Sequence, residues 1–316
     1  KYSNYKNWNL SSIIKEEFSK YANFQTVLVS ILNYRFAQNL HSRNIKLKKV
    51  INWFENTSVD KGWNFGFRKF YPKISIIGYQ GYTLYRQFIC LHPSKAEYLY
   101  KVIPNKIIVI GKSYKKIRQE FCKNLKINIG PALRFNHLFS FKHKSNFEKK
   151  YNILVSLSID NEVSKKILGD IINSKWCNSG KKIYVKSHPL VPLSKIIQRN
   201  EVPNNLIELK GNFFEIAKNS KIIISAGISS SILEGFACGC AILIPEVSKN
   251  DYQDFTYLKI PKASYKICKS VKELDKGIDH FINEKKRDEK KRIKKMYLLK
   301  SKLFEKTTQR NLNIFL

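Results

Sequence analysis

The sequence predicts an α/β protein with two domains, each built on a parallel sheet. Apolar, β-branched runs of strand length alternate with longer segments of helical periodicity, which is the pattern of βα units covered on both faces. The chain has 316 residues, about twice the usual size of one domain. Between about 131 and 150 the periodicity fails and a polar, basic segment follows. We therefore place the domain boundary there, giving domains 1–145 and 146–316.

The first domain is expected to begin with two helices, near 10–21 and 23–43, because apolar positions recur there at helical spacing. Short β-branched runs then predict strands in both domains. These strands are Lys49–Phe54, Ile74–Gly78, Lys106–Ile110, Tyr151–Leu157, Lys182–Lys186, Leu206–Leu209, Lys221–Ser225 and Ala241–Ile244.

The C-terminal stretch 271–306 has helical periodicity and many basic residues. Two interpretations stay open: a solvated basic helix, or a helix face that rests on anionic phospholipid.

The chain is strongly basic, with 58 Lys and Arg against 24 Asp and Glu and a formal net charge of +34. Such a charge indicates an anionic partner: nucleic acid, acidic lipid, or a phosphorylated or carboxylated substrate. Lys, Asn, Ile and Tyr are all abundant, which is typical of an AT-rich genome, so codon bias accounts for part of the charge. No helix-turn-helix, zinc-finger or RNA-binding signature accompanies it, and we expect no nucleic-acid partner.

Cysteine usage and hydropathy indicate where the protein works. The six cysteines show neither zinc-ribbon spacing nor the density of a disulfide scaffold, which fits a reducing cytoplasm. Cys238 and Cys240 lie in an apolar run and are expected to be buried thiols. No apolar run approaches the roughly 18 residues needed to cross a bilayer, and the N-terminus lacks a signal-peptide core. We expect a cytoplasmic protein, either soluble or peripheral on the inner face of the inner membrane.

One candidate binding motif follows the strand at Lys182–Lys186. The strand ends in Lys186-Ser187-His188-Pro189, and the proline prevents the strand from continuing. Ligands in open α/β sheets bind at the carboxyl edge, where a lysine and an imidazole can both donate to phosphate oxygens. A His-Pro pair is also a common loop former, and His92-Pro93 is a second copy.

A second motif joins the strand at Lys221–Ser225 to a helix. The turn contains Gly227 and the run Ser229-Ser230-Ser231, and Glu234 follows one helical turn later. Free backbone N–H groups and the positive end of the helix dipole make such a turn an anion site. The serines alternatively only cap the helix, with Ser230 or Ser231 as the N-cap and Glu234 completing a capping box. Capping and phosphate binding use the same geometry and do not exclude each other.

Together the two motifs resemble a known family. Over roughly residues 150–250, the order strand, Lys-x-His-Pro, helix, strand, helix, strand, Ser-Ser-Ser-x-x-Glu and Ala-x-Gly resembles the C-terminal half of GT-B glycosyltransferases. More narrowly, it is similar to bacterial transferases that use CMP-activated sugars, the sialyltransferases and Kdo transferases. The resemblance implies two Rossmann-like domains whose parallel sheets face an interdomain cleft.

The same resemblance assigns the donor nucleotide to particular residues. It implies that the histidine and serines hold the CMP phosphate, that the glutamate contacts a ribose hydroxyl, and that a Lys-Gly-Asn loop lies beside the base. The donor residues are Lys186, His188, Pro189, Gly211, Asn212, Gly227, Ser229, Ser230, Ser231 and Glu234.

The first domain is expected to hold the acceptor. A strand delivers Glu55 to its carboxyl end, where it could act as a catalytic base, and Asp60, Lys61 and Gln80 follow on neighbouring loops. The stretch from 50 to 68 is similar to one in surface-carbohydrate biosynthesis proteins of Gram-negative bacteria. A surface or helix-capping glutamate is the alternative for Glu55.

A rival carboxylate, Asp160, follows the first strand of the second domain. Retaining Kdo transferases resemble this region in placing an acidic nucleophile there, although an Asp that opens a helix is more often a cap. His188 completes the catalytic candidates, and inverting or retaining chemistry stays open. The chain has no Asp-x-Asp triplet, so we expect no essential metal and no cofactor apart from the CMP-sugar substrate.

The expected function is transfer of a CMP-activated nonulosonic acid, such as Kdo or a sialic-acid relative, to a glycan or glycolipid of the bacterial surface. The expected partners are this donor, that acceptor and an anionic membrane. Two alternatives stay open: a CDP-polyol phosphotransferase of the teichoic-acid type, and a non-enzymatic polyanion-binding protein.

Overall fold

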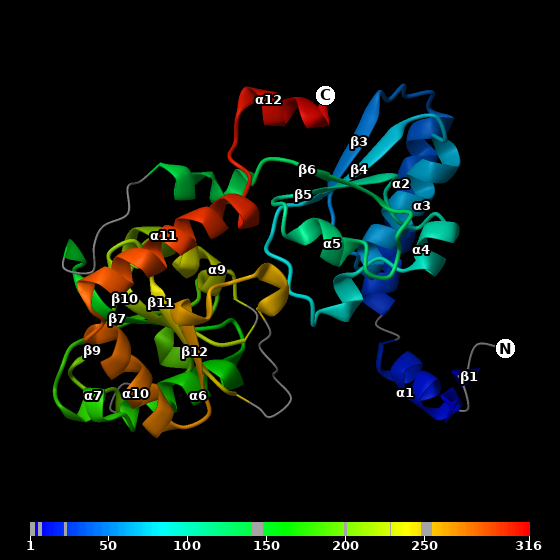
Figure 1. Ribbon diagram of the computed structural model, residues 1–316. Helices are drawn as coiled ribbons and strands as arrows, with labels where there is room; N and C mark the ends of the chain where they lie inside the picture. Colours follow the sequence, from blue (N-terminus) through cyan, green and yellow to red (C-terminus); the bar gives the residue numbers. More distant parts are fainter. Residues whose placement is uncertain are drawn as a thin grey trace.

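The computed structural model describes residues 4–5, 8–21, 24–140, 148–198, 201–227, 229–247 and 255–316. Its two larger sheets are entirely parallel and carry helices, so the predicted fold class is confirmed (Figure 1). A short antiparallel pair, β1 (Asn4–Tyr5) and β2 (Trp8–Asn9), precedes them. No helix among the described residues is both long and apolar enough to cross a lipid bilayer.

The first domain has a four-stranded sheet of order β3-β4-β5-β6. Its strands are β3 (Lys49–Trp53), β4 (Ser75–Gln80), β5 (Lys106–Val109) and β6 (Lys126–Ile129). Its helices are α1 (Ser11–Tyr21), α2 (Phe24–Ser42), α3 (Ser58–Phe70), α4 (Lys95–Leu99) and α5 (Tyr114–Arg118). α2 and α3 pack closely because Gly62 faces Ser30, where an added Cβ would lie 1.8 Å from the Ser30 carbonyl oxygen.

The second domain has a six-stranded sheet of order β12-β11-β10-β7-β8-β9. Its strands are β7 (Tyr151–Ser156), β8 (Ile183–Lys186), β9 (Leu206–Glu208), β10 (Ser220–Ile224), β11 (Ala241–Pro245) and β12 (Tyr265–Cys268). The chain winds outward from β7 on one side and from β10 on the other. The strand order therefore reverses between β7 and β10, which is where open α/β sheets bind ligands.

The helices of the second domain connect these strands and cover the sheet. They are α6 (Asn161–Ile172), α7 (Lys175–Asn178), α8 (Phe213–Ala217), α9 (Ser230–Ala237), α10 (Val271–Ile282) and α11 (Lys286–Leu303). The 3-10 helices of the whole described chain, in both domains and their connection, are η1 (Ile89–Leu91), η2 (Leu133–Phe139), η4 (Leu193–Lys195), η6 (Thr256–Leu258), η7 (Lys262–Ser264) and η8 (Asn313–Phe315).

The short strands β1 and β2 were not predicted, and in the two parallel sheets and their helices two strands and one helix break also differ from the prediction. β6 and β12 were not predicted because each is a four-residue edge strand that contains a lysine, Lys126 or Lys266, and neither has a continuous apolar run. The predicted single helical stretch 271–306 is two helices, α10 and α11, because α10 ends at its C-cap residue, Asn283.

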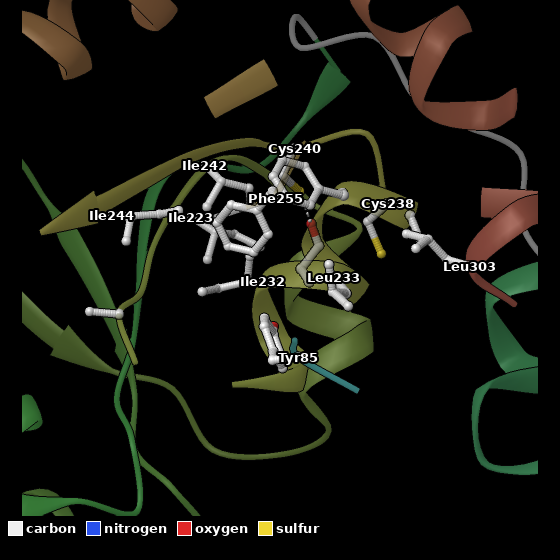
Figure 2. Close-up of a cluster of buried hydrophobic side chains, with 14 of the residues drawn as sticks. Tyr85, Ile223, Ile232, Leu233, Cys238, Cys240, Ile242, Ile244, Phe255 and Leu303 are labelled. Atoms are coloured by element: carbon white, nitrogen blue, oxygen red, sulfur yellow. Dashed lines mark hydrogen bonds between the residues drawn. The ribbon is translucent and has the colours of Figure 1, made fainter. Parts of the chain in front are cut away.

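The two domains share one continuous hydrophobic core. Figure 2 shows Tyr85, from the loop after β4, beside Ile232 and Leu233 of α9. The Tyr85 hydroxyl donates a hydrogen bond to the carbonyl oxygen of Ser229 at 2.6 Å, so the first domain touches the serine turn directly. The same cluster contains Cys238, a buried, unpaired thiol like the neighbouring Cys240.

The C-terminal residues return to the first domain. After α11, the Glu305 N–H donates to the Ile110 carbonyl oxygen at 2.7 Å. α12 (Gln309–Leu312) lies near the first sheet (Figure 1). It leads to Phe315, whose ring centroid is 5.4 Å from that of Tyr79. The sequence pattern assigns all of 146–316 to the second domain, whereas these last residues pack on the first sheet.

Candidate nucleotide-binding site

A cavity of about 450 Å³ opens at the carboxyl edge of the second sheet. Four loops form it, those that follow β7, β8, β9 and β10, and η2 of the interdomain connection closes one side. The lining residues are Arg134, Phe135, His137, Ser156, Leu157, Lys186, Ser187, His188, Pro189, Gly211, Asn212, Phe213, Ser229, Ser230, Ser231 and Glu234. Except for Gly227, the residues predicted to bind the donor nucleotide all line this cavity.

His188 is half-buried and its geometry selects one tautomer. Its Nδ1 accepts a hydrogen bond from the backbone N–H of Leu190 at 3.2 Å. Nδ1 therefore carries no proton, and the Nε2–H is the ring's donor. Burial, and to a smaller extent the nearby Lys186 ammonium, lowers the pKa of His188. The imidazole is consequently neutral at pH 7 and offers one N–H to a ligand.

Lys186, the last residue of β8, and Ser187, which follows it, are each held by a hydrogen bond. The Lys186 Nζ donates to the Ser187 carbonyl oxygen at 3.1 Å. The Ser187 hydroxyl in turn donates to the carboxylate of Glu208, on β9, at 2.5 Å. These bonds hold the end of β8 in one conformation and keep a cation beside His188.

The serine turn is a hydroxyl network at the start of α9. Ser229, in extended backbone conformation, is the N-cap, and its hydroxyl accepts from the Ser231 N–H at 3.3 Å. The Ser231 hydroxyl lies 2.7 Å from that of Ser229 and 3.1 Å from that of Ser225. The prediction that Ser230 or Ser231 caps the helix is wrong, because the helix already begins at Ser230.

Glu234 does not complete a capping box either. It is buried, its Oε1 accepts from the Ser230 hydroxyl at 3.0 Å, and its Oε2 lies 3.6 Å from Nε2 of His137. The His137 ring packs on Phe214 with centroids 4.6 Å apart. This places a carboxylate on the cavity wall, where it can accept hydrogen bonds from a ligand.

Gly211 and Asn212 shape the opposite side of the cavity. Gly211 has φ of 103°, a conformation that favours glycine, so the chain can turn sharply after β9. The Asn212 side chain accepts from the Phe214 N–H at 2.8 Å and caps α8. Gly227, at φ 69°, shapes the turn after β10 but does not line the cavity.

Sequence reasoning missed several lining residues. Ser156, Leu157 and Phe213 lie in or beside predicted strands or motifs, whereas Arg134, Phe135 and His137 come from the interdomain connection. The latter three lie on η2, in the segment where periodicity failed. A basic residue and a histidine within four positions were the available signal, but their place beside the second domain depends on tertiary packing. The Lys300 Nζ of α11 donates to the Leu138 carbonyl oxygen at 2.9 Å and so holds η2 in place.

The residues predicted for catalysis and acceptor binding in the first domain lie outside this cavity. Glu55 is half-exposed, and its carboxylate accepts from the Trp53 indole N–H at 2.8 Å. Asp60 is buried and accepts from the Thr57 N–H at 2.9 Å and the Glu55 N–H at 3.2 Å. Asp60 therefore fixes the start of α3 and the backbone of Glu55, and its assignment as an acceptor contact stays a prediction.

Lys61 and Gln80 are also held by other residues. The Lys61 ammonium bonds Asn56 and pairs with Glu97, and burial lowers its pKa. Gln80 is fully buried, and its Oε1 accepts from Nε of the buried Arg118 at 2.7 Å. Gln80 therefore supports the loop from inside, where no acceptor can touch it.

Asp160 is the N-cap of α6. Its carboxylate accepts from the N–H groups of Glu162 at 2.9 Å and Val163 at 3.2 Å, and it does not line the cavity. These hydrogen bonds agree with the second interpretation of Asp160, that of a residue that caps a helix. Within the described ranges, no group of three or more His, Cys, Asp or Glu side chains is placed to hold a metal ion.

Comparisons with known proteins give similarity in structure but not in sequence. No protein-family model and no curated protein matches this sequence. The structure of OtsA, a trehalose-6-phosphate synthase, has a TM-score of 0.51 at 9% identity, covering 86% of this chain and 73% of that one.

Two further solved structures are similar to this chain. CalG4, the calicheamicin glycosyltransferase, has a TM-score of 0.52 at 10% identity over 90% of this chain and 79% of its own. UGT89C1 of Arabidopsis thaliana has a TM-score of 0.51 at 11% identity over 83% and 71%. At such identities the similarity concerns the fold alone, and the two parallel sheets with their helices agree with it: the chain has the GT-B fold.

Proposed function

We propose that this protein is a glycosyltransferase that moves a CMP-activated nonulosonic acid, Kdo or a sialic-acid relative, to a bacterial surface glycan. One observation carries the proposal: the His-Pro loop and the serine turn, 40 residues apart in sequence, line a single cavity with Glu234 and Asn212. The cavity volume suits a nucleotide, since small-molecule sites span about 300–1,000 Å³.

The proposed chemistry follows from the donors on the cavity wall. When the bond between the sugar and the phosphate oxygen breaks, negative charge grows on the CMP phosphate. The neutral His188 Nε2–H, the serine hydroxyls and the N-terminus of α9 are all fixed in advance and can stabilise that charge. Lys186 adds a full positive charge. Catalysis would then come chiefly from stabilising the leaving group.

An acceptor hydroxyl must lose a proton in the same reaction. Glu55 is the proposed base, because it is a half-exposed carboxylate at the carboxyl end of β3 and Asp60 orders its backbone. Asp160 is the rival carboxylate, and its two backbone hydrogen bonds favour a structural role.

The choice of CMP over UDP depends on the sequence motifs. A structural neighbour, a trehalose-6-phosphate protein from E. coli, was solved bound with UDP-2-fluoro glucose, so the shared fold alone does not select the base. The Lys-x-His-Pro and serine motifs favour CMP, and an acidic sugar suits a chain with a net charge of +34.

A donor panel tests the proposal. The protein is incubated separately with CMP-Kdo, CMP-sialic acid, CDP-glycerol and UDP-glucose, and the released nucleotide is measured by chromatography. We expect CMP release from a CMP-sugar and a large loss of that release in His188→Ala. Release from CDP-glycerol would instead indicate a polyol phosphotransferase, and UDP release would contradict the proposed donor. Binding without turnover that vanishes in salt would indicate a polyanion-binding protein.

A further inference from the structure

A second cavity, of about 760 Å³, lies at the junction of the two domains. Its walls come from the loop after β4 and from α5 in the first domain, from η6 and the residue after it in the second, and from the end of α11. The lining residues are Arg86, Lys112, Ser113, Lys116, Ile117, Glu120, Tyr257, Leu258, Lys259 and Lys302. None of them lines the nucleotide cavity.

The junction cavity is far more basic than the chain as a whole. Five of its ten lining residues are Lys or Arg, against 58 of 316 in the sequence. Its one carboxylate, Glu120, already pairs with Arg86, whose Nη2 lies 2.6 Å from Oε1. The hydrogen bond from Arg86 lowers the pKa of Glu120, so the pair is ionised at neutral pH.

The four lysines have no such partner in the part of the chain that the structure describes. No ion pair between described residues involves Lys112, Lys116, Lys259 or Lys302. Like charges gathered around one concave surface focus a positive potential there and attract an anion. A ligand with several negative charges would satisfy more of these ammonium groups than a single ion.

The floor of the junction cavity is apolar and joins both domains. Ile117 and Leu258 are buried, and the hydroxyl of Tyr257 accepts from the Arg86 N–H at 3.3 Å. A small saccharide could lie on this floor with its anionic groups toward the lysines, because the volume is within the range of small-molecule sites.

We propose that the junction cavity binds the acidic end of the acceptor glycan, a saccharide that carries several carboxylate or phosphate groups. This inference rests on the proposed glycosyltransferase function. It assigns the donor nucleotide and the acidic end of the acceptor to separate cavities, and it explains part of the basic charge by a specific anionic ligand.

Calorimetric titration of the full chain tests the proposal with two probes, a sialic acid trimer for carboxylates and inorganic tripolyphosphate for phosphates. The test variant is Lys116→Glu with Lys259→Glu. The matched control is Lys115→Glu with Lys262→Glu, which makes the same charge change on α5 and near η6 at exposed lysines outside the cavity. CMP is titrated into every protein as well.

We expect at least one probe to bind the unaltered chain, and the one that binds identifies the anionic group. The test variant should weaken that binding by at least about tenfold, since each reversal replaces an attraction with a repulsion, while the control stays within about threefold. Equal losses in both variants, or no binding of either probe, would overturn the proposal. CMP binding should be unchanged in both variants, so failure of the donor site would appear separately, as absent CMP binding in the unaltered chain.

Discussion

Replacing His188 by alanine is expected to weaken CMP binding by about ten- to thirtyfold. A hydrogen bond to a charged group contributes about 1.5–3 kcal/mol, and about 1.4 kcal/mol corresponds to a tenfold change in affinity. His188 is half-exposed, so water can replace part of the lost bond, and the lower part of that range applies. The assay is calorimetric titration with CMP at pH 7.5.

Two further measurements separate the imidazole donor from a general loss of structure. His188→Gln keeps a side-chain N–H and should recover part of the affinity. Because burial lowers the pKa of His188, its ring is already neutral at pH 7 and stays so as the pH rises, and affinity should be flat from pH 7 to 8.5. His41→Ala, on α2, is the control. Wild-type affinity in His188→Ala, or an equal loss in the control, would show that the His188 imidazole does not bind the phosphate.

Three other substitutions test the site and its frame. Ser229→Ala removes the α9 N-cap and should lower stability by about 1 kcal/mol, measured by thermal unfolding, and also weaken CMP binding; an unchanged midpoint would contradict the cap. Glu234→Gln should raise the donor KM with little change in kcat, as for a contact made equally in the ground and transition states; a selective kcat loss would argue against this. Arg292→Met leaves Glu284 buried without its partner and should cost about 3 kcal/mol or more in urea unfolding, most of which a paired Glu284→Leu should recover; an undiminished loss in the double variant would contradict that account.

The nucleotide cavity could be predicted from sequence because its parts follow strands. His188 and the serine turn each come directly after an apolar run, and the carboxyl ends of parallel strands meet at one sheet edge. The positions of Lys186, His188 and Ser229 directly after predicted strands were therefore enough to predict that they lie close together. The N-cap was misplaced by one or two residues because three consecutive serines offer three equivalent caps.

Other parts of the site could not be predicted in this way. The side of η2 that faces the cavity depends on the packing of His137 on Phe214 and on the bond from Lys300 to Leu138, contacts between distant parts of the chain. Gln80 shows the opposite problem. It was predicted on the loop after a strand, whereas it is the last residue of β4, and its side chain turns inward to Arg118, 38 residues away, which no local pattern indicates.

The most direct test of the central claim is a crystal structure of the protein with CMP bound. We expect the phosphate between the Nε2–H of His188 and the hydroxyls of Ser229–Ser231 at the start of α9, with the ribose near Glu234. A CMP phosphate bound anywhere else, including the junction cavity, would contradict this expectation.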